Sequence, residues 1–150
     1  MPIRCEVVTQ DRALYEGDAE MVVAPGAQGE LGILPNHAPL LTTLGFGVLR
    51  VQHHDGEEVF AIAGGILEVR PDIITVLADV GEHIDEIDQD RAEDARRRAE
   101  ELLASGPPPD TDEYLRIQAA LRRSNLRLDA IRRFRRTSRP TPQSRSSEEN

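Results

Sequence analysis

Four arginines and an aspartate have residue types and spacings that suit the binding of a phosphate group. They are Asp88, Arg91, Arg98, Arg123 and Arg127. Intervals of three and seven residues place the first three along one flank of a helix, and an interval of four places the last two one turn apart on another. Guanidinium groups bind phosphate oxygens through charge-assisted, often bidentate hydrogen bonds. A triphosphate would therefore offset the repulsion among the arginines, which is about 2 kcal/mol per pair at an effective dielectric of about 20.

The same pattern has a simpler interpretation that needs no ligand. The segment Ile87-Asp88-x-x-Arg91-Ala92 is short, and a salt bridge on a helix surface can produce it. Solvated arginines paired with Asp and Glu would account for the remaining charges. Asp88 itself repels phosphate, so in a nucleotide site its carboxylate would position an arginine or accept a hydrogen bond from the adenine amino group.

Two helices are needed to position these side chains. The first carries a narrow stripe of mostly small residues at intervals of three and four, namely Ala92, Ala95, Ala99 and Leu102. Gly106 and the three prolines that follow it end this helix. Thr111 is the predicted cap of the second helix, whose apolar seam consists of Tyr114, Ile117, Leu121, Ser124, Leu128 and Ile131. Three residues off the seam, expected to meet the sandwich or another protein, are Leu115, Leu126 and Phe134. The short connector predicts an antiparallel α-helical hairpin.

Residues 1–84 show a different pattern, in which short apolar runs are separated by turn-forming residues. The predicted strands are Ile3–Thr9, Ala19–Ala24, Glu30–Leu34, Leu40–Leu44, Gly47–Gln52, Glu58–Ala63, Ile66–Arg70 and Ile73–Ala78. We interpret the segment Ala13–Asp18 as a turn, and Asp55-Gly56 gives the clearest hairpin signal. Short strands at even spacing are typical of an antiparallel β-sandwich or barrel. The expected fold is therefore an all-β N-terminal sandwich followed by the helical hairpin.

Charge is distributed unevenly along the chain. Residues 1–84 carry four Arg against thirteen acids, a net charge of −9, whereas residues 114–139 carry nine Arg and one acid. A nucleic-acid binder would use this arginine-rich helix, but the acidic body repels a polyanion and aromatic stacking groups are nearly absent. We therefore expect no nucleic-acid partner. All 18 basic residues are Arg, which excludes a Walker-type phosphate loop because that loop needs a lysine.

The sequence does not support a catalytic or metal site. Every serine lies beyond residue 84, which excludes a serine nucleophile in the sandwich. His53 and His54 are adjacent, so on a strand they point to opposite faces and cannot easily share a metal ion. Cys5 is the single cysteine, and its expected role is that of a small buried hydrophobe.

Two longer segments resemble a known family. They are Gly29-Glu30-Leu31-Gly32-Ile33-Leu34-Pro35-Asn36-His37-Ala38-Pro39-Leu40-Leu41-Thr42 and Gly64-Gly65-Ile66-Leu67-Glu68-Val69-Arg70-Pro71. Together they closely resemble the epsilon subunit of the bacterial F-type ATP synthase, and the similarity runs from residue 2 to residue 136. It implies a ten-stranded β-sandwich at the foot of the rotor, gripped by the gamma subunit and seated on the c ring. It also implies that Glu30 faces the c ring and that His37 lies near gamma.

The same resemblance gives the phosphate-binding pattern a specific ligand. Ile87-Asp88-x-x-Arg91-Ala92 matches the family's ATP-binding motif, and the family's other contact positions are occupied by Glu82, Arg98, Arg123 and Arg127. This implies ATP as a regulatory ligand that holds the hairpin folded, without a metal. The released basic helix would reach the catalytic beta and alpha subunits, together with gamma, and inhibit ATP hydrolysis. The alternative is a structural hairpin that senses no nucleotide.

The sequence also predicts where the protein is located and where its domains begin and end. The chain lacks an N-terminal targeting pattern, and no segment approaches the ~18 apolar residues of a membrane span. With the resemblance, this predicts a non-catalytic subunit attached peripherally, without direct membrane insertion, to the cytoplasmic face of a bacterial cell membrane. The predicted parts are a docking sandwich (1–84), a regulatory arm (85–136) and a disordered tail (137–150) that contains no apolar residue.

Overall fold

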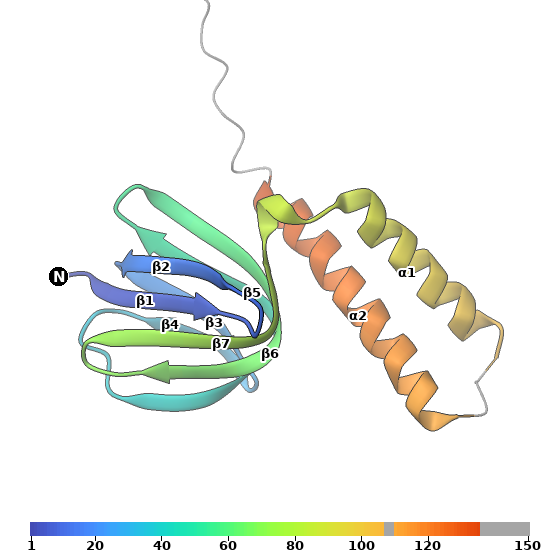
Figure 1. The fold of residues 1–150 in the computed structure, drawn as a ribbon, viewed down its shortest axis with the longest axis horizontal. Coiled ribbons are helices and arrows are strands. Elements are labelled where there is room, and N and C mark those ends of the chain that lie inside the picture. The colour runs from blue at the N-terminus through green and yellow to red at the C-terminus, as the bar shows by residue number, and fades with distance from the viewer. Residues whose placement is uncertain (107–109, 136–150) are drawn as a thin grey trace, which may run out of the picture.

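The computed structural model describes residues 1–106 and 110–135, which form a β-sandwich followed by two helices (Figure 1). The strands are β1 (Ile3–Val8), β2 (Ala13–Ala19), β3 (Met21–Gly26), β4 (Gly29–Ile33), β5 (Leu40–His53), β6 (Gly56–Val69) and β7 (Ile73–His83). A single 3-10 turn, η1 (Ile84–Glu86), leads into α1 (Gln89–Ala104) and then α2 (Thr111–Phe134). In Figure 1 the helices run side by side in opposite directions, with α2 nearer the sandwich. The predicted fold class is confirmed, whereas the predicted tail lies outside the described residues.

The seven strands belong to one hydrogen-bonded sheet in the order β2-β1-β7-β6-β5-β3-β4. Within the described residues, β1 and β7 pair in parallel and the other neighbouring strands pair antiparallel. The sheet encloses a core of Val, Ile and Leu side chains in which Phe60 is the largest fully buried residue. Cys5 belongs to this core, and burial raises the pKa of its thiol to about 12. Its predicted role as a buried hydrophobe is confirmed.

The strand count is lower than the ten that the resemblance implies. β5 and β6 each continue for 14 residues through glycines that the sequence pattern treats as breaks. Gly65 has a φ of 137°, and a Cβ there would lie 2.2 Å from the main-chain oxygen of Leu77. The glycine therefore permits a close backbone approach and a bend without ending the strand. The interpretation of Ala13–Asp18 as a turn is wrong, because these residues belong to the edge strand β2 and their charges suit that position.

The helix ends follow local capping chemistry. The N-cap of α2 is Asp110, whose Oδ1 accepts a hydrogen bond from the main-chain N–H of Asp112 at 2.9 Å. Thr111, the predicted cap, is instead the first helical residue, in keeping with the stronger capping preference of Asp. Gly106, with a φ of 106°, follows the end of α1 as predicted. In the part of the chain that the structure describes, no helix is both long enough and apolar enough to cross a membrane.

The hairpin meets the sandwich through a second, smaller apolar cluster that we call the hinge cluster. Its buried members are Val59, Ala61, Ile84, Ile87, Ala130 and Ile131, with Val48, Leu126 and Phe134 packed against them. Two cation–π contacts lie between β5 and α2. The Arg122 guanidinium lies 4.3 Å from the ring centroid of Phe46, and that of Arg50 lies 5.6 Å from the ring centroid of Phe134. Strand and helix thus each supply one cation and one ring.

Candidate nucleotide site and arm attachment

A cleft of about 410 Å³ lies where the end of β7, the start of α1 and the middle of α2 meet. Its lining consists of Glu82, Glu86, Ile87, Asp88, Arg91, Ala92, Ala95, Arg98 and Arg127. Seven of the eight residues that the sequence assigns to an ATP site therefore line one cleft. The eighth, Arg123, lies beside it in a narrow crevice that Glu82 and Arg127 also line. The folded hairpin brings residues from both helices and from the sandwich to one place.

The segment from Ile87 to Ala92 also has a local structural role. Asp88 is the N-cap of α1, and its Oδ1 accepts a hydrogen bond from the main-chain N–H of Arg91 at 3.1 Å. The side chains of Ile87 and Ala92 are buried, with 4% and 2% of their surfaces exposed. The Arg91 residue is exposed at the cleft. The motif therefore starts the helix and anchors it, while directing one guanidinium to the cleft.

The charges in the cleft are only partly paired. Nε of Arg127 donates to Oε1 of Glu82, and this ion pair joins α2 to the sandwich. Among the residues that the structure describes, the side chains of Arg91, Arg98 and Arg123 have no hydrogen bond or ion pair. An anion placed in the cleft would meet the unpaired guanidiniums of Arg91 and Arg98, with that of Arg123 in the adjoining crevice. This arrangement favours a phosphate-bearing ligand.

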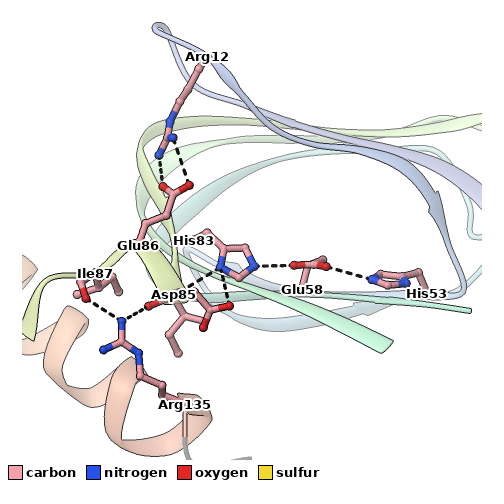
Figure 2. A network of polar contacts seen from close by, with 9 residues as sticks. Arg12, His53, Glu58, His83, Asp85, Glu86, Ile87 and Arg135 are labelled. Carbon is pink, nitrogen blue, oxygen red and sulfur yellow. Dashed lines mark hydrogen bonds and ion pairs between the residues drawn. The ribbon is translucent and has the colours of Figure 1, made fainter. Parts of the chain in front are cut away.

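The carboxylate of Glu86, which also lines the cleft, is paired with an arginine of the sandwich. Both terminal nitrogens of Arg12, which lies in the turn after β1, donate to the carboxylate oxygens of Glu86 (Figure 2). These hydrogen bonds hold the pKa of Glu86 below its ordinary value. Glu86 therefore stays ionised but compensated, so it repels a bound phosphate less than a free carboxylate would. No sequence signal pointed to this pair.

A further contact, which the sequence did not reveal, joins the end of α2 to the segment between β7 and α1. Nη2 of Arg135 donates to the main-chain oxygens of Ile84 and Ile87, each at 2.7 Å (Figure 2). These carbonyls belong to η1 and to the residue that follows it. Because guanidinium donors bond strongly to carbonyl oxygens, Arg135 fixes the position of α2 relative to the last strand of the sandwich.

The two residues assigned to partner proteins lie away from the cleft lining. Glu30 is exposed and is the second residue of β4, close to the turn that joins β4 to β3. His37 lies in the loop between β4 and β5, and its Nδ1 is 2.7 Å from the main-chain oxygen of Ala38. Neither residue lines the cleft between β7, α1 and α2. Within the described residues, no three His, Cys, Asp or Glu side chains are grouped to hold a metal ion.

Comparison with known proteins assigns the class of this architecture. The model of the ATP synthase delta/epsilon chain β-sandwich domain matches residues 2–84, and that of the delta/epsilon long α-helix domain matches residues 85–132. The chain belongs to the ATP synthase delta/epsilon family. It is thus a non-catalytic subunit of the ATP synthase complex, and the resemblance seen in its sequence is confirmed.

Relatives named ATP synthase epsilon chain match most of the chain. The one from Alkalilimnicola ehrlichii is 42% identical and covers 89% of this chain and 95% of its own. The one from Acidithiobacillus ferridurans is 46% identical, covering 90% and 94%. A chain of the Euglena gracilis mitochondrial ATP synthase has the same fold, with a TM-score of 0.74 and 22% identity over 87% of this chain and 81% of that one.

Proposed function

We propose that this subunit works in the central stalk of a bacterial F-type ATP synthase and limits ATP hydrolysis through its helical hairpin, whose folded state ATP stabilises. The observation that carries the proposal is the cleft shared by β7, α1 and α2. A triphosphate bound there would bridge Arg91 and Arg98 on α1 to Arg127 on α2. A ligand that binds one state and not the other shifts the equilibrium toward the state it binds.

The packing of the hairpin supports such an equilibrium. The buried residues of α1 are Ala92 and Ala99, and those of α2 are Ser124, Ala130 and Ile131. Small side chains bury little apolar area, and each Å² contributes only about 25 cal/mol. The hinge cluster supplies the buried apolar contact between the described part of the hairpin and the sandwich, and it has only six buried members. The folded hairpin therefore depends on polar contacts that a ligand can strengthen.

The released hairpin has a surface suited to inhibition. Residues 114–139 carry nine Arg and one acid, so an extended α2 would bind an acidic protein surface. We assign that surface to the catalytic beta and alpha subunits, with gamma alongside. Removal of residues 88–150 is then expected to raise ATP hydrolysis by the assembled complex without preventing assembly. Unchanged hydrolysis in a correctly assembled complex would refute the inhibitory role.

Calorimetric titration with ATP tests the nucleotide site directly. Arg91→Ala removes a guanidinium of the cleft, and losing a hydrogen bond to a charged group costs about 1.5–3 kcal/mol, or about 10- to 100-fold in affinity. Arg97→Ala is a matched control on the same helix, because Arg97 is paired with Asp94 and lies outside the cleft lining. The control should bind ATP as the wild type does. Absence of binding by the wild type, or equal binding by all three proteins, would contradict the proposal.

A hairpin that senses no nucleotide is the second candidate. The Asp88 cap and the Glu82–Arg127 ion pair favour it, because both are satisfied without a ligand. In that case the wild type gives no heat with ATP, while removal of residues 88–150 still changes hydrolysis.

We further propose that the sandwich docks on the c ring and gamma at the cytoplasmic face of the membrane, through Glu30 and His37 respectively. The exposure of Glu30 beside a tight turn supports this placement. A cysteine at position 30 should cross-link to a c-ring subunit in the assembled complex, and one at 37 to gamma. Glu20→Cys, exposed between β2 and β3, serves as the control and should do neither.

A further inference from the structure

Two histidines bracket one carboxylate at the joint between sandwich and hairpin. Nε2 of His83 lies 2.5 Å from Oε2 of Glu58, and Nε2 of His53 lies 3.4 Å from Oε1 of the same side chain (Figure 2). His83 is the last residue of β7 and His53 the last of β5, with Glu58 on β6 between them. The two imidazoles are only 21% and 19% exposed, respectively. The cluster is thus built into the end of the sheet that carries the hairpin.

The hydrogen bonds determine where the protons lie. The main-chain N–H of Asp85 donates to Nδ1 of His83 at 3.1 Å, and that of Asp55 donates to Nδ1 of His53 at 3.2 Å. Because an amide N–H can only donate, each Nδ1 must be an unprotonated acceptor. The neutral rings therefore carry their protons on Nε2 and donate them to Glu58. A metal ion at Nε2 would require a proton on Nδ1, which these amides oppose.

His83 also controls the start of η1. It is the N-cap of this turn, because its Nδ1 accepts the N–H of Asp85. The guanidinium of Arg135 donates to the carbonyl of Ile84, which is part of η1, and to the carbonyl of Ile87, the residue that follows η1. An unbroken series of hydrogen bonds thus runs from Glu58 through His83 and η1 to the end of α2 (Figure 2).

We propose that His83 is a proton-sensitive latch: protonation of its Nδ1 disrupts the cap of η1 and releases α2 from the sandwich. A protonated Nδ1 becomes a donor that faces the N–H of Asp85, so their hydrogen bond is lost. A carboxylate oxygen that could accept from it, Oδ2 of Asp85, lies 3.6 Å from Nδ1. Turning that carboxylate toward the ring shifts η1 and with it the carbonyls that hold Arg135. Imidazole is the side chain whose charge ordinarily changes between about pH 5 and pH 8.

The charged groups around His83 make this protonation local in effect. The carboxylates of Glu58 on β6 and of Asp85 and Glu86 on η1 surround His83 with negative charge, although Arg12 already pairs with Glu86. Positive charge comes from the guanidinium of Arg135 on α2, and the imidazole of His53 on β5 shares the carboxylate of Glu58. The Nε2–H group of His83 donates a hydrogen bond to Glu58 whether or not Nδ1 is protonated, so the contact between His83 and β6 is unchanged. Protonation therefore changes the hydrogen bond at Nδ1, which connects His83 to η1.

The inference rests on the hairpin mobility proposed above but not on nucleotide binding, so a distance measurement without ATP tests it. Spin labels at Asp72→Cys on the sandwich and Glu113→Cys on α2 report opening in the full chain, since both sites are exposed. The native Cys5 stays unlabelled because it is buried and its thiol pKa is raised to about 12. Lowering the pH from about 8 to about 5.5 should raise the open-to-folded ratio about fivefold, the factor that loss of one N-cap bond corresponds to.

Two variants separate the latch from a general effect of acid. His83→Asn keeps an acceptor for the N–H of Asp85 but cannot titrate, so its label distances should not depend on pH. His54→Asn, in the exposed turn next to the cluster, should respond as the wild type does. A wild type without a pH response, or a His83→Asn variant that retains it, would overturn the latch. Nitrogen NMR of the imidazoles at about pH 8 must also place the His83 proton on Nε2.

The latch and the nucleotide site can fail separately. An arm that opens with acid in a chain that gives no heat with ATP would retain the latch and remove the nucleotide site. An arm that binds ATP and stays closed at about pH 5.5 would do the reverse.

Discussion

The sandwich and the hairpin are stabilised in different ways. The sandwich buries long side chains on the inner face of its sheet, including Phe60, Ile62, Leu49 and Leu67, each with no exposed surface. Among the described residues, the two helices bury mainly alanines, and their largest buried side chain, Ile131, belongs to the hinge cluster. Because the stabilisation from apolar burial scales with area, the sandwich gains more from its core than the hairpin gains from its own buried side chains.

The two ends of the hairpin differ in the same way. At the sandwich end, the hinge cluster and the two hydrogen bonds of Arg135 hold α2 in place. At the far end, Leu102 and Leu115 are 52% and 54% exposed, and Leu115 is the off-seam residue that does not belong to the hinge cluster. The hairpin should therefore open first at its far end and pivot about η1.

The largest expected effect concerns the sandwich core. Phe60→Ala should lower the free energy of unfolding by about 3–5 kcal/mol, because a fully buried ring leaves a cavity. Leu102→Ala on α1 should cost less than about 0.5 kcal/mol, since its side chain is half exposed. Denaturant unfolding followed by circular dichroism measures both. If the two substitutions lowered the free energy of unfolding by similar amounts, the sandwich and the hairpin would share one core.

A smaller loss of stability is expected where the hairpin joins the sandwich. Arg135→Gln removes the guanidinium that bonds to the carbonyls of Ile84 and Ile87, at a cost of about 1.5–3 kcal/mol. Hydrogen exchange should accelerate in α2 by about 10- to 100-fold and stay unchanged in β6. Arg132→Gln, whose side chain pairs with Asp129 on the same helix, is the control and should change neither. Equal acceleration in both elements would show that they unfold as one unit.

The cation–π contact between α2 and β5 should contribute less. Arg122→Ala is expected to destabilise the docked hairpin by about 0.5–1 kcal/mol, the usual range for such a contact at an exposed site. A double-mutant cycle with Phe46→Leu isolates the pair, and Arg116→Ala, an exposed arginine on the same helix, gives the background. Additive effects of the two substitutions would mean that ring and guanidinium do not interact.

The smallest effect concerns the Arg12–Glu86 pair at the cleft. Because the pKa of Glu86 is lowered in the folded chain, its stabilisation is present above the ordinary glutamate range and is lost as the pH falls through the lowered value. Arg12→Gln should therefore destabilise slightly at neutral pH and have no effect in acid. Both side chains are about half exposed, so salt should reduce the difference further. A difference that persists in acid would assign it to another contact of Arg12.

Local pattern was sufficient to predict much of this molecule. The period of three and four residues in α2, with Gly106 and the prolines before it, predicted two antiparallel helices. The same spacing grouped the arginines of the cleft, because residues one turn apart share a helix face. The strand count was less predictable, since a glycine can end a strand or bend it, and only the neighbouring backbone at Gly65 decides which.

By itself, the sequence determined the order of sheet and hairpin, the basic face of α2 and the grouping of the arginines along each helix, since all of these depend on neighbours a few positions apart. The tertiary structure alone decided the polar contacts of the joint. Glu58 and His83 are 25 residues apart, Arg135 and Ile87 are 48 apart, and Arg12 and Glu86 are 74 apart. No periodicity relates such positions, because they meet only after the sheet has closed and α2 has returned to its edge.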